Sequence, residues 1–287
     1  MSLQDMLSRR PSIGWNDQLL LALNILGGKH TPYRVVVIDE HFRVKGVISG
    51  RRILEVLLGR RGEALKIRKG LKGVLREPVN LFLDEARNVF TENSTIQTVL
   101  QYMAENNVGY VIIVNESGIF KGVIDEASIL SKLLNKVFNI KTKEIMKHPV
   151  VTVSPENTLL EASTLMVDFR VRRVIVVEKD TMVGLLTITD VLNHVLREQK
   201  YLELLLYDKE VQEIFTEKVK NVMSSNVISI NPEKDVGEAV DKIVKNDISC
   251  LPVSVKSKIL GVICRIDLVS EIVKIKGVST VLKMLSE

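Results

Sequence analysis

The segment from Gly184 to Asp190 holds the residues of this chain that are best suited to bind a polar ligand. Apolar runs flank the segment, and their composition predicts a strand that turns into a helix. Thr187 and Thr189 offer hydroxyls at the turn, and we expect Asp190 at the N-cap of the helix. A carboxylate in this place can accept two hydroxyl groups, and the first N–H groups of a helix bind anions. Taken alone, the segment is more simply a capped turn.

The same pattern occurs four times, and this repetition favours a shared role over a chance turn. Each copy is expected to contain a short strand, a helix, a strand, a tight turn, a strand with a glycine and a second helix. The glycine leaves room for another group to approach the strand closely. The glycines are Gly46, Gly122, Gly184 and Gly261, the strands before them cover residues 34–38, 110–114, 174–177 and 251–253, and the long helices cover 16–26, 94–105, 157–168 and 234–245.

These repeats predict the fold class, which is α+β with four βαββα units. The repeats are expected at residues 1–60, 72–138, 143–197 and 218–275. The intervals between the glycines are long, short and long in turn, which indicates two modules at residues 1–139 and 140–287. We expect a hinge near 140–144, a solvated basic loop at 60–76 and a helical connector at about 197–218.

The composition is that of a globular protein with an ordinary core. Of the 287 residues, 46% are hydrophobic and 26% charged, which excludes a disordered chain. The sequence has no run of about 18 apolar residues, which a membrane-spanning helix would need. The polar N-terminal residues lack the apolar core of a signal peptide, so we expect a cytoplasmic protein without a membrane partner. Cys250 and Cys264 lie on strands that are expected to pair, and reduced, buried thiols are the favoured interpretation. The net charge of +5 indicates anionic partners only weakly.

Patterns needed for catalysis are absent from the sequence. The four histidines lack metal-ligand spacing, no nucleophile–base set can be assembled, and no Gly-x-x-x-x-Gly-Lys-Ser/Thr sequence occurs. We therefore expect no metal site, no catalytic cofactor and no enzymatic activity.

The repeated unit resembles the CBS (cystathionine-β-synthase) domain. The motifs that carry the resemblance are Met146-x-x-Pro149-Val150, Val174-Ile-Val-Val177, Gly184-x-x-Thr187-x-x-Asp190 and Leu251-Pro-Val253. With four repeats and no attached catalytic domain, the chain is similar to the gamma subunit of AMP-activated protein kinase. The resemblance implies that repeats pair through their sheets into two pseudo-twofold Bateman modules. It also implies a regulatory ligand, either an adenine nucleotide (AMP, ADP or ATP) or S-adenosylmethionine.

The resemblance implies further that two repeats share each ligand. One repeat would hold the ribose and phosphate through its hydroxyl and carboxylate, and its partner would supply an apolar adenine slot. The first site would comprise Thr187, Thr189 and Asp190 with the slot Val227, Ile228, Ile248 and Ser249, and the second site Cys264, Ile266 and Asp267 with the slot Val150, Val151, Val171 and Arg172. Arg172 and Arg173 match positions that reach phosphates in the kinase subunit.

The four copies depart unevenly from the family motif. Arg52 stands where repeat 1 should have the aspartate, and repeat 2 has Asp125 and Ser128 in place of the threonine and aspartate. The first module is thus expected to be empty, structural, or adapted to another anion through Arg51 and Arg52. Repeat 4 has a cysteine in place of the threonine, so the best ligand site is expected at Asp190.

The expected function is that of a non-catalytic, energy-sensing regulator that acts on a partner enzyme or as a homodimer. Two alternatives stay open. A nucleic-acid-binding or transcription-linked regulator would use the basic stretch 60–76, although this stretch has no interleaved aromatic residues for base stacking. A structural partner subunit would carry degenerate clefts.

Overall fold

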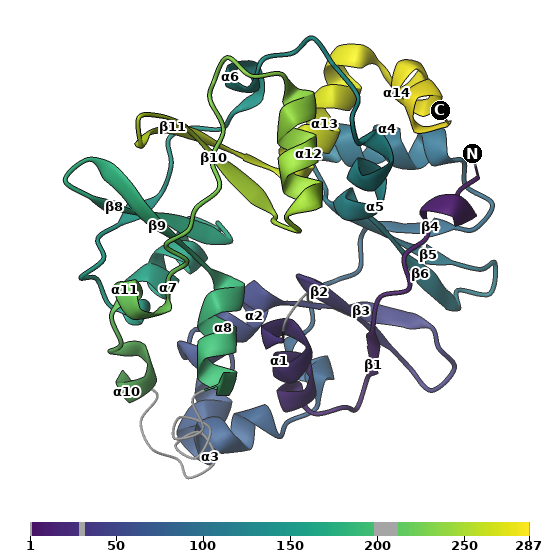
Figure 1. Cartoon of the computed structure of the whole chain (residues 1–287). Coiled ribbons are helices and arrows are strands. Elements are labelled where there is room, and N and C mark those ends of the chain that lie inside the picture. Colours follow the sequence, from purple (N-terminus) through teal and green to yellow (C-terminus); the bar gives the residue numbers. More distant parts are fainter. Residues whose placement is uncertain (1, 29–31, 198–211, 287) are drawn as a thin grey trace. The chain divides into compact units, whose positions relative to one another are not determined.

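The computed structural model describes residues 2–28, 32–197 and 212–286, and these residues contain four copies of one unit. In three copies a short first strand runs parallel to the second strand, which pairs antiparallel with the third. In the fourth copy Ile230 forms a single parallel bridge to Val253 in place of the first strand. The predicted α+β class with βαββα units is confirmed (Figure 1).

The bounds of the elements follow the repeats. Repeat 1 contains β1 (Ser12–Gly14), α1 (Leu19–Gly27), β2 (Arg34–Ile38), β3 (Val44–Ser49) and α2 (Gly50–Leu57). Repeat 2 contains β4 (Val89–Thr91), α4 (Ile96–Asn106), β5 (Tyr110–Val114), β6 (Phe120–Asp125), α5 (Glu126–Leu130) and η3 (Ser131–Leu133). Repeat 3 contains β7 (Thr152–Val153), α7 (Leu159–Asp168), β8 (Arg173–Glu178), β9 (Thr181–Thr187) and α8 (Ile188–Arg197). Repeat 4 contains α12 (Val236–Lys245), β10 (Cys250–Val255), β11 (Lys258–Cys264) and α13 (Arg265–Lys276). The remaining elements are η1 (Gln4–Met6), α3 (Glu63–Leu75), η2 (Val79–Phe82), α6 (Thr142–Ile145), α10 (Gln212–Phe215), α11 (Val219–Val222) and α14 (Val278–Ser286).

All four long helices begin later than the sequence predicts, and in three of them, α4, α7 and α12, a side-chain cap fixes the first turn. Thr158 accepts a hydrogen bond from the Glu161 N–H at 3.2 Å, and the Glu161 carboxylate accepts from the Thr158 N–H at 2.7 Å. This reciprocal capping box satisfies two donors at once and starts α7 at Leu159. Thr95 caps α4 and Asp235 caps α12 in a similar way.

The described chain packs into two compact units, and each unit takes repeats from both halves of the sequence. Unit 1 comprises Met1–Arg10, Arg87–Val150 and Ile228–Glu287, whereas unit 2 comprises Pro11–Ala86 and Val151–Val227. Unit 1 therefore holds repeats 2 and 4, and unit 2 holds repeats 1 and 3. The predicted modules at 1–139 and 140–287 concern pairing through the sheets and stay a prediction.

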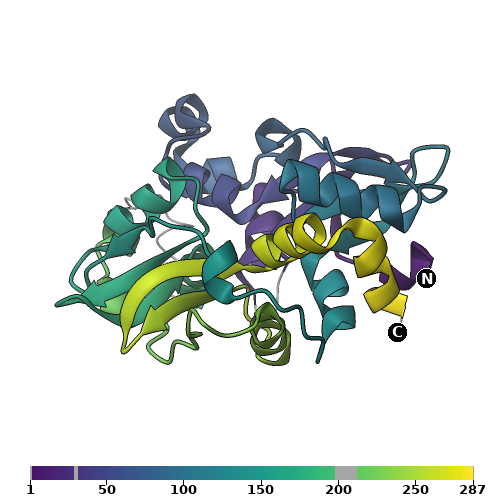
Figure 2. The same cartoon turned by 90° about the horizontal axis from the view of Figure 1, so that it is seen from above.

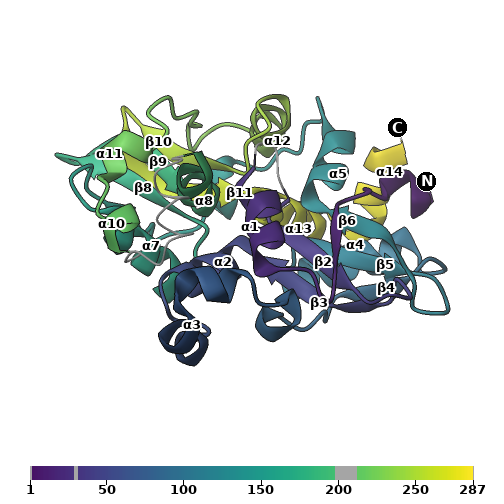
Figure 3. The same cartoon turned by 90° about the horizontal axis from the view of Figure 1, so that it is seen from below.

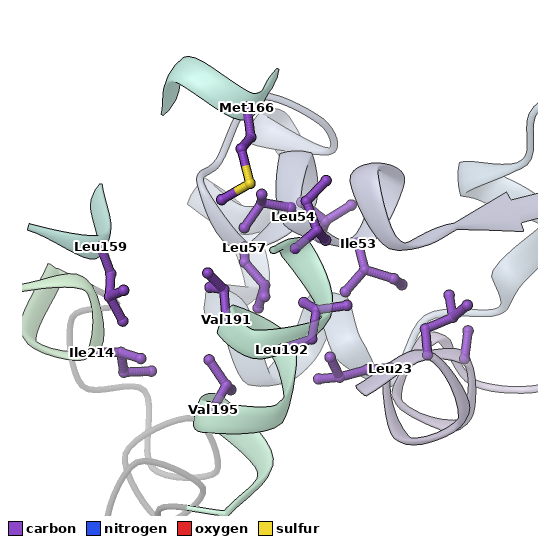
Figure 4. Packing of buried hydrophobic residues seen from close by; sticks show 14 of the residues in the cluster. Leu23, Ile53, Leu54, Leu57, Leu159, Met166, Val191, Leu192, Val195 and Ile214 are labelled. Carbon is purple, nitrogen blue, oxygen red and sulfur yellow. The ribbon is translucent and has the colours of Figure 1, made fainter. Parts of the chain in front are cut away.

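Unit 2 is built on the apolar faces of four helices, α1 and α2 from repeat 1 and α7 and α8 from repeat 3. Figure 4 shows side chains of α2, such as Leu54 and Leu57, gathered with Val191 and Leu192 of α8. These four side chains are 0% exposed. Helices with one apolar face gain most by burying those faces against each other, so repeats distant in sequence share one core.

Unit 1 repeats this arrangement with the helices of repeats 2 and 4. Helix α13 packs against α4 and α5 (Figure 3), and α14 follows it at the end of the chain (Figure 2). The buried residues include Leu100 and Met103 of α4 and Leu268 and Ile272 of α13, each 0% exposed.

The glycine of each third strand lies beneath a segment that leads into another repeat. Val47 and Asp84 exchange two backbone hydrogen bonds of 2.9 Å, and Leu185 and Ser224 do the same at 3.0 and 2.9 Å. In unit 1 the corresponding pairs are Ser8–Val123 and Lys147–Val262. The closest neighbours of a side chain placed at the four glycines come from Leu83–Asp84, Leu7–Ser8, Met223 and Met146–Lys147. The predicted close approach to the strand is therefore made by the chain itself.

Other parts of the chain differ from the sequence-based expectations. The basic stretch expected as a loop forms α3, which is kinked at Gly70 (φ 65°) and buries Leu71 and Val74 in the core of unit 2. The segment expected as a hinge near 140–144 is anchored in unit 1, where Ile140 is 3% exposed and Thr142 is fully buried. Most of the predicted connector at 197–218 lies outside the described residues. No helix in the described part is long and apolar enough to cross a membrane.

Candidate functional site

Thr187 and Asp190 form a closed hydrogen-bonded pair at the start of α8. The Asp190 carboxylate Oδ2 accepts from the Thr187 N–H at 2.8 Å and from its hydroxyl at 2.7 Å. The Asp190 N–H donates to Thr187 Oγ1 at 3.1 Å. The expectation that Asp190 is the N-cap is therefore wrong, because Thr187 caps the helix and Asp190 lies on its first turn at the third position. Thr189, between them, is partly exposed.

Asp190 keeps one oxygen for another partner. Its Oδ1 has no hydrogen bond within the described residues, whereas its Oδ2 has two. Burial raises the pKa of the Asp190 carboxyl above its ordinary value, and the two hydrogen bonds from Thr187 oppose the rise. A partly buried carboxylate with a vacant acceptor at a helix N-terminus is suited to a ligand that donates hydroxyl hydrogens.

We use the term half-site for the equivalent pair at the start of the second helix of each repeat. In repeat 2 the Asp125 carboxylate accepts from the Ser128 N–H at 3.0 Å and from the Arg10 guanidinium at 2.6 and 3.0 Å. In repeat 1 Ser49 caps α2, and Arg52, which is 7% exposed, pairs with Glu55 and Asp84. The carboxylate of Asp125 is thus paired within the chain, and Arg52 pairs with two carboxylates through its Nη atoms, whereas Arg52 Nε is buried without a hydrogen bond among the described residues.

The half-site of repeat 4 is modified by a disulfide. Cys250 and Cys264 are directly opposite one another on β10 and β11, with Cα atoms 4.0 Å apart, and their sulfurs are bonded. The expectation of two reduced thiols is therefore wrong, because the register of the hairpin brings the side chains together. Asp267, 6% exposed, accepts from the Cys264 N–H at 2.9 Å, as Asp190 does from Thr187. Ile266, between them, is partly exposed.

The predicted adenine slots draw residues from both compact units, and their assembly stays a prediction. Unit 1 contains Val150, Ile228, Ile248 and Ser249, and unit 2 contains Val151, Val171, Arg172, Arg173 and Val227. Ile228 and Ile248 pack against the core of unit 1, and Val151 and Val171 against that of unit 2.

The backbone of the predicted slots is already engaged. The Arg265 N–H donates to the Ser249 carbonyl at 3.0 Å, and Arg265 Nε donates to the Ile248 carbonyl at 2.9 Å. In unit 2 the Ile188 N–H donates to the Arg172 carbonyl at 3.0 Å. These bonds hold the residues that precede strands β10 and β8. A ligand that bonded to the Ile248 carbonyl would share it with Arg265.

A cluster of arginines and one tyrosine was not predicted as a unit. The Arg172 guanidinium lies 3.9 Å from the centroid of the Tyr33 ring, and the Tyr33 hydroxyl is buried without a hydrogen bond among the described residues. Arg51 Nη2 donates to the Arg170 carbonyl at 2.9 Å. Repeat 1 therefore holds arginines of repeat 3 in place, a contact that no motif within either repeat could have signalled.

The basic stretch is partly neutralised by its own neighbours. Arg60 pairs with Asp168, Arg61 with Glu55 at 3.6 Å, and Lys69 with Glu77. The described residues contain no cluster of His, Cys, Asp or Glu that could hold a metal ion.

Comparisons with known proteins agree with this architecture. The chain is 28% identical over 255 residues to an uncharacterised 33.4 kDa protein encoded in the ribosomal RNA operon of Thermofilum pendens, and the match covers 88% of this chain and 84% of that protein. The crystal structure of MJ1225 from Methanocaldococcus jannaschii, proposed as an archaeal homologue of γ-AMPK, superposes with a TM-score of 0.85 at 22% identity, covering 94% of this chain and 99% of MJ1225. An uncharacterised conserved protein from Pyrococcus horikoshii superposes with a TM-score of 0.61 at 18% identity, covering 95% and 100%.

A model of the CBS domain matches residues 81–135, 143–197 and 219–274, which together make up more than half of the chain. These segments coincide with repeats 2, 3 and 4, and repeat 1 has the same order of elements. The chain therefore belongs to the CBS-domain family.

Proposed function

We propose that this protein is a non-catalytic regulator that binds an adenosyl ligand, with repeat 3 providing the principal half-site. The ligand is an adenine nucleotide or S-adenosylmethionine, whose ribose carries two neighbouring hydroxyls. In this proposal one hydroxyl donates to Asp190 Oδ1, and Thr187 and Thr189 line the turn. Arg172 and Arg173 lie on the phosphate side, and the slot of Val227, Ile228, Ile248 and Ser249 receives the adenine.

The vacant Asp190 Oδ1 is the observation that carries the proposal. Keeping a carboxylate partly buried costs stability, and burial raises the pKa of Asp190 even though the hydrogen bonds from Thr187 and the charge of Arg197 oppose the rise. The equivalent groups of repeats 1 and 2 are compensated by ion pairs within the chain. Asp190 Oδ1 has no hydrogen bond among the described residues, so it is an acceptor that a ligand could use.

The half-site of repeat 4 is the weaker one. Asp267 keeps the carboxylate, but the disulfide at Cys264 removes the side-chain donor that Thr187 supplies in repeat 3. Its slot would be Val150, Val151, Val171 and Arg172. We propose a structural role for the half-sites of repeats 1 and 2, whose charged groups serve the chain itself.

Ligand would act by stabilising one arrangement of the repeats, which a partner enzyme or a second copy of the chain then reads. We propose a cytoplasmic location for this regulator. The alternative of nucleic-acid binding through residues 60–76 is disfavoured, because three of the basic side chains in that stretch already pair with carboxylates.

Thermal unfolding with AMP, ADP, ATP and S-adenosylmethionine at millimolar concentration tests the proposal. A ligand that binds only the folded protein raises the midpoint temperature of unfolding. When the ligand concentration is 100 times its Kd, the free energy of unfolding increases by about 2.7 kcal/mol. Asp190→Asn should reduce the shift, and the matched variant Asp125→Asn should leave it intact. The absence of a shift with all four compounds would refute ligand sensing, and equal losses in both variants would refute the site.

A further inference from the structure

The half-sites of repeats 2 and 3 contain the same two groups in opposite order. In repeat 3 the hydroxyl residue Thr187 precedes the helix, and the carboxylate residue Asp190 lies three residues later. In repeat 2 the carboxylate residue Asp125 precedes the helix, and the hydroxyl residue Ser128 lies three residues later. The Ser128 N–H donates to Asp125 Oδ1 at 3.0 Å, and the Asp125 N–H donates to Ser128 Oγ at 3.3 Å. Because a capping box places its two side chains next to one another, both repeats present a carboxylate beside the first helical turn.

The two carboxylates divide their oxygens in the same way. Asp190 uses Oδ2 for its capping box and has no hydrogen bond to Oδ1 among the described residues. Asp125 uses Oδ1 for its capping box, and its Oδ2 accepts from Arg10 Nη2 at 2.6 Å and from Arg10 Nε at 3.0 Å. The oxygen that is vacant in repeat 3 is therefore the one that a guanidinium fills in repeat 2.

The N-terminal segment holds Arg10 in this position. Leu3 and Met6 are buried in the core of unit 1, and Ser8 exchanges two backbone hydrogen bonds of 2.8 and 3.0 Å with Val123 of β6. Arg10 follows two residues later, and its side chain is 30% exposed, whereas its carboxylate partner is 14% exposed. A ligand must therefore displace a cation on an anchored backbone to reach this carboxylate.

Arg10 also stands at a position that is apolar in repeats 3 and 4. In these three repeats the equivalent residue of the first strand pairs with the fourth residue of the second strand, and these residues are Ile13, Val153 and Ile230. Three residues before them the sequence has Arg10, Val150 and Val227. The two valines begin the proposed adenine slots, so repeat 1 has a guanidinium where repeats 3 and 4 have an apolar side chain.

We propose that Arg10 is a specificity-determining residue that closes the repeat 2 half-site to the adenosyl ligand. Its guanidinium takes the place of a ligand hydroxyl on Asp125 Oδ2 and neutralises the carboxylate. Two charge-assisted hydrogen bonds from within the chain are stronger than one from a neutral hydroxyl, and a free ligand also loses its freedom of movement when it binds. Removal of the Arg10 side chain therefore opens a further site for the same class of ligand, an adenine nucleotide or S-adenosylmethionine. This inference rests on the proposed function, which defines the ligand.

Isothermal titration with AMP and with S-adenosylmethionine tests the inference in a background where the carboxylates of repeats 3 and 4 are neutral. In Asp190→Asn/Asp267→Asn, binding through these two repeats should be weakened by about 10- to 150-fold. Adding Arg10→Val to this background should tighten binding by about 10-fold or more, and adding Asp125→Asn as well should remove the gain. Circular dichroism checks that each variant is folded.

Arg9→Val is the matched control, because Arg9 carries the same charge next to Arg10 and is exposed. This variant should leave the affinity of the background unchanged. Arg10→Gln covers the case in which valine prevents folding, since glutamine can still donate to Asp125 but leaves the carboxylate without a counter-charge. A ligand displaces this neutral donor more easily than a guanidinium, so Arg10→Gln should also tighten binding.

The outcomes separate this inference from the proposed function. If the wild-type protein binds ligand through Asp190 but the folded Arg10 variants show no gain, Arg10 closes no site and the inference alone is wrong. A gain that survives Asp125→Asn, or that Arg9→Val also produces, would overturn it as well. If neither the wild-type protein nor any variant binds, the proposed function and the inference are wrong together.

Discussion

Replacing Asp190 with asparagine should separate stability from ligand binding. In the wild-type protein Asp190 Oδ2 accepts a hydrogen bond from the Thr187 N–H at 2.8 Å. This N–H needs an acceptor, so in the variant the amide oxygen of the asparagine should take the place of Oδ2. The amide NH₂ group then takes the place of Oδ1. A donor would therefore face the ligand where the wild-type protein offers an acceptor, and the ligand hydroxyl would lose its partner.

The size of the loss follows from the strength of a hydrogen bond to a charged group. Such a bond contributes about 1.5–3 kcal/mol, which corresponds to about 10- to 150-fold in Kd. The free energy of unfolding without ligand should change by less than about 1 kcal/mol. The bond to the Thr187 N–H is kept, and the cost of burying a charge disappears, which offsets the weaker neutral bond.

The pH dependence provides a second signature. Burial raises the pKa of Asp190 in the folded protein above the ordinary value of 3.8, so the folded state binds more protons than the unfolded state in the interval between the two values. Stability of the wild-type protein relative to Asp190→Asn should therefore fall as pH rises from below 3.8 through the raised pKa, and then level off.

Isothermal titration with AMP and urea denaturation of both proteins provide the assay. The matched control is Asp125→Asn, whose carboxylate accepts from Arg10 at 2.6 and 3.0 Å. This control should lose stability, because Arg10 would no longer face a charged partner, and should keep ligand affinity. Unchanged affinity of Asp190→Asn, or a loss of stability as large as in Asp125→Asn, would refute the reasoning.

Three further predictions concern the fold. Gly237→Ala should destabilise the protein by about 1–3 kcal/mol in urea denaturation, although alanine normally stabilises a helix, because its Cβ would collide with the Lys136 carbonyl oxygen; a gain in stability would contradict this packing. Leu192→Ala should cost about 2–5 kcal/mol by the same measurement, since the side chain is fully buried between α1, α2 and α8, and a cost below 1 kcal/mol would place Leu192 outside the core. Replacing both cysteines with serine should cost at most about 3 kcal/mol, the value for a loop of about 15 residues, and the loss should disappear when the comparison is made with reduced wild-type protein.

The sequence predicts the individual elements well because their signals are local. Apolar spacing defines one face of each helix, and the alternating runs around each glycine define a hairpin whose register the turn controls. Three helix starts are displaced because a cap such as Thr158 selects one residue among several polar candidates, whereas α1 starts late at Leu19 without a side-chain cap. The expectation that Asp190 is the N-cap is wrong for the same reason, since threonine and aspartate three residues apart can cap in either order and form a reciprocal box.

Partners distant in sequence are a different problem. An apolar helix face indicates that the helix is buried but does not specify against which surface. With four similar repeats, the helices of repeat 1 have three similar partners to choose from, and the structure selects those of repeat 3. The stacking of Arg172 on Tyr33 depends on this selection, and the pairing of Arg52 with Asp84 depends on where the segment that enters repeat 2 crosses repeat 1. No spacing within one repeat could reveal them.

The glycine strands carry the one long-range signal that the sequence did contain. A glycine in a strand indicates that another group lies close to the backbone. From the sequence alone, that group can equally well be a ligand or another segment of the chain. Here Gly46 lies beneath the segment that enters repeat 2, and Gly122 beneath the segment that enters repeat 1. In the same way, Gly184 lies against Met223, in the segment that enters repeat 4. Gly261 lies against Met146 and Lys147, in the segment that enters repeat 3. These contacts assign the glycines to pairing with other segments of the chain. In the function that we propose, the ligand is therefore bound by the last residues of the motif, Thr187 and Asp190, and not at the glycine that begins it.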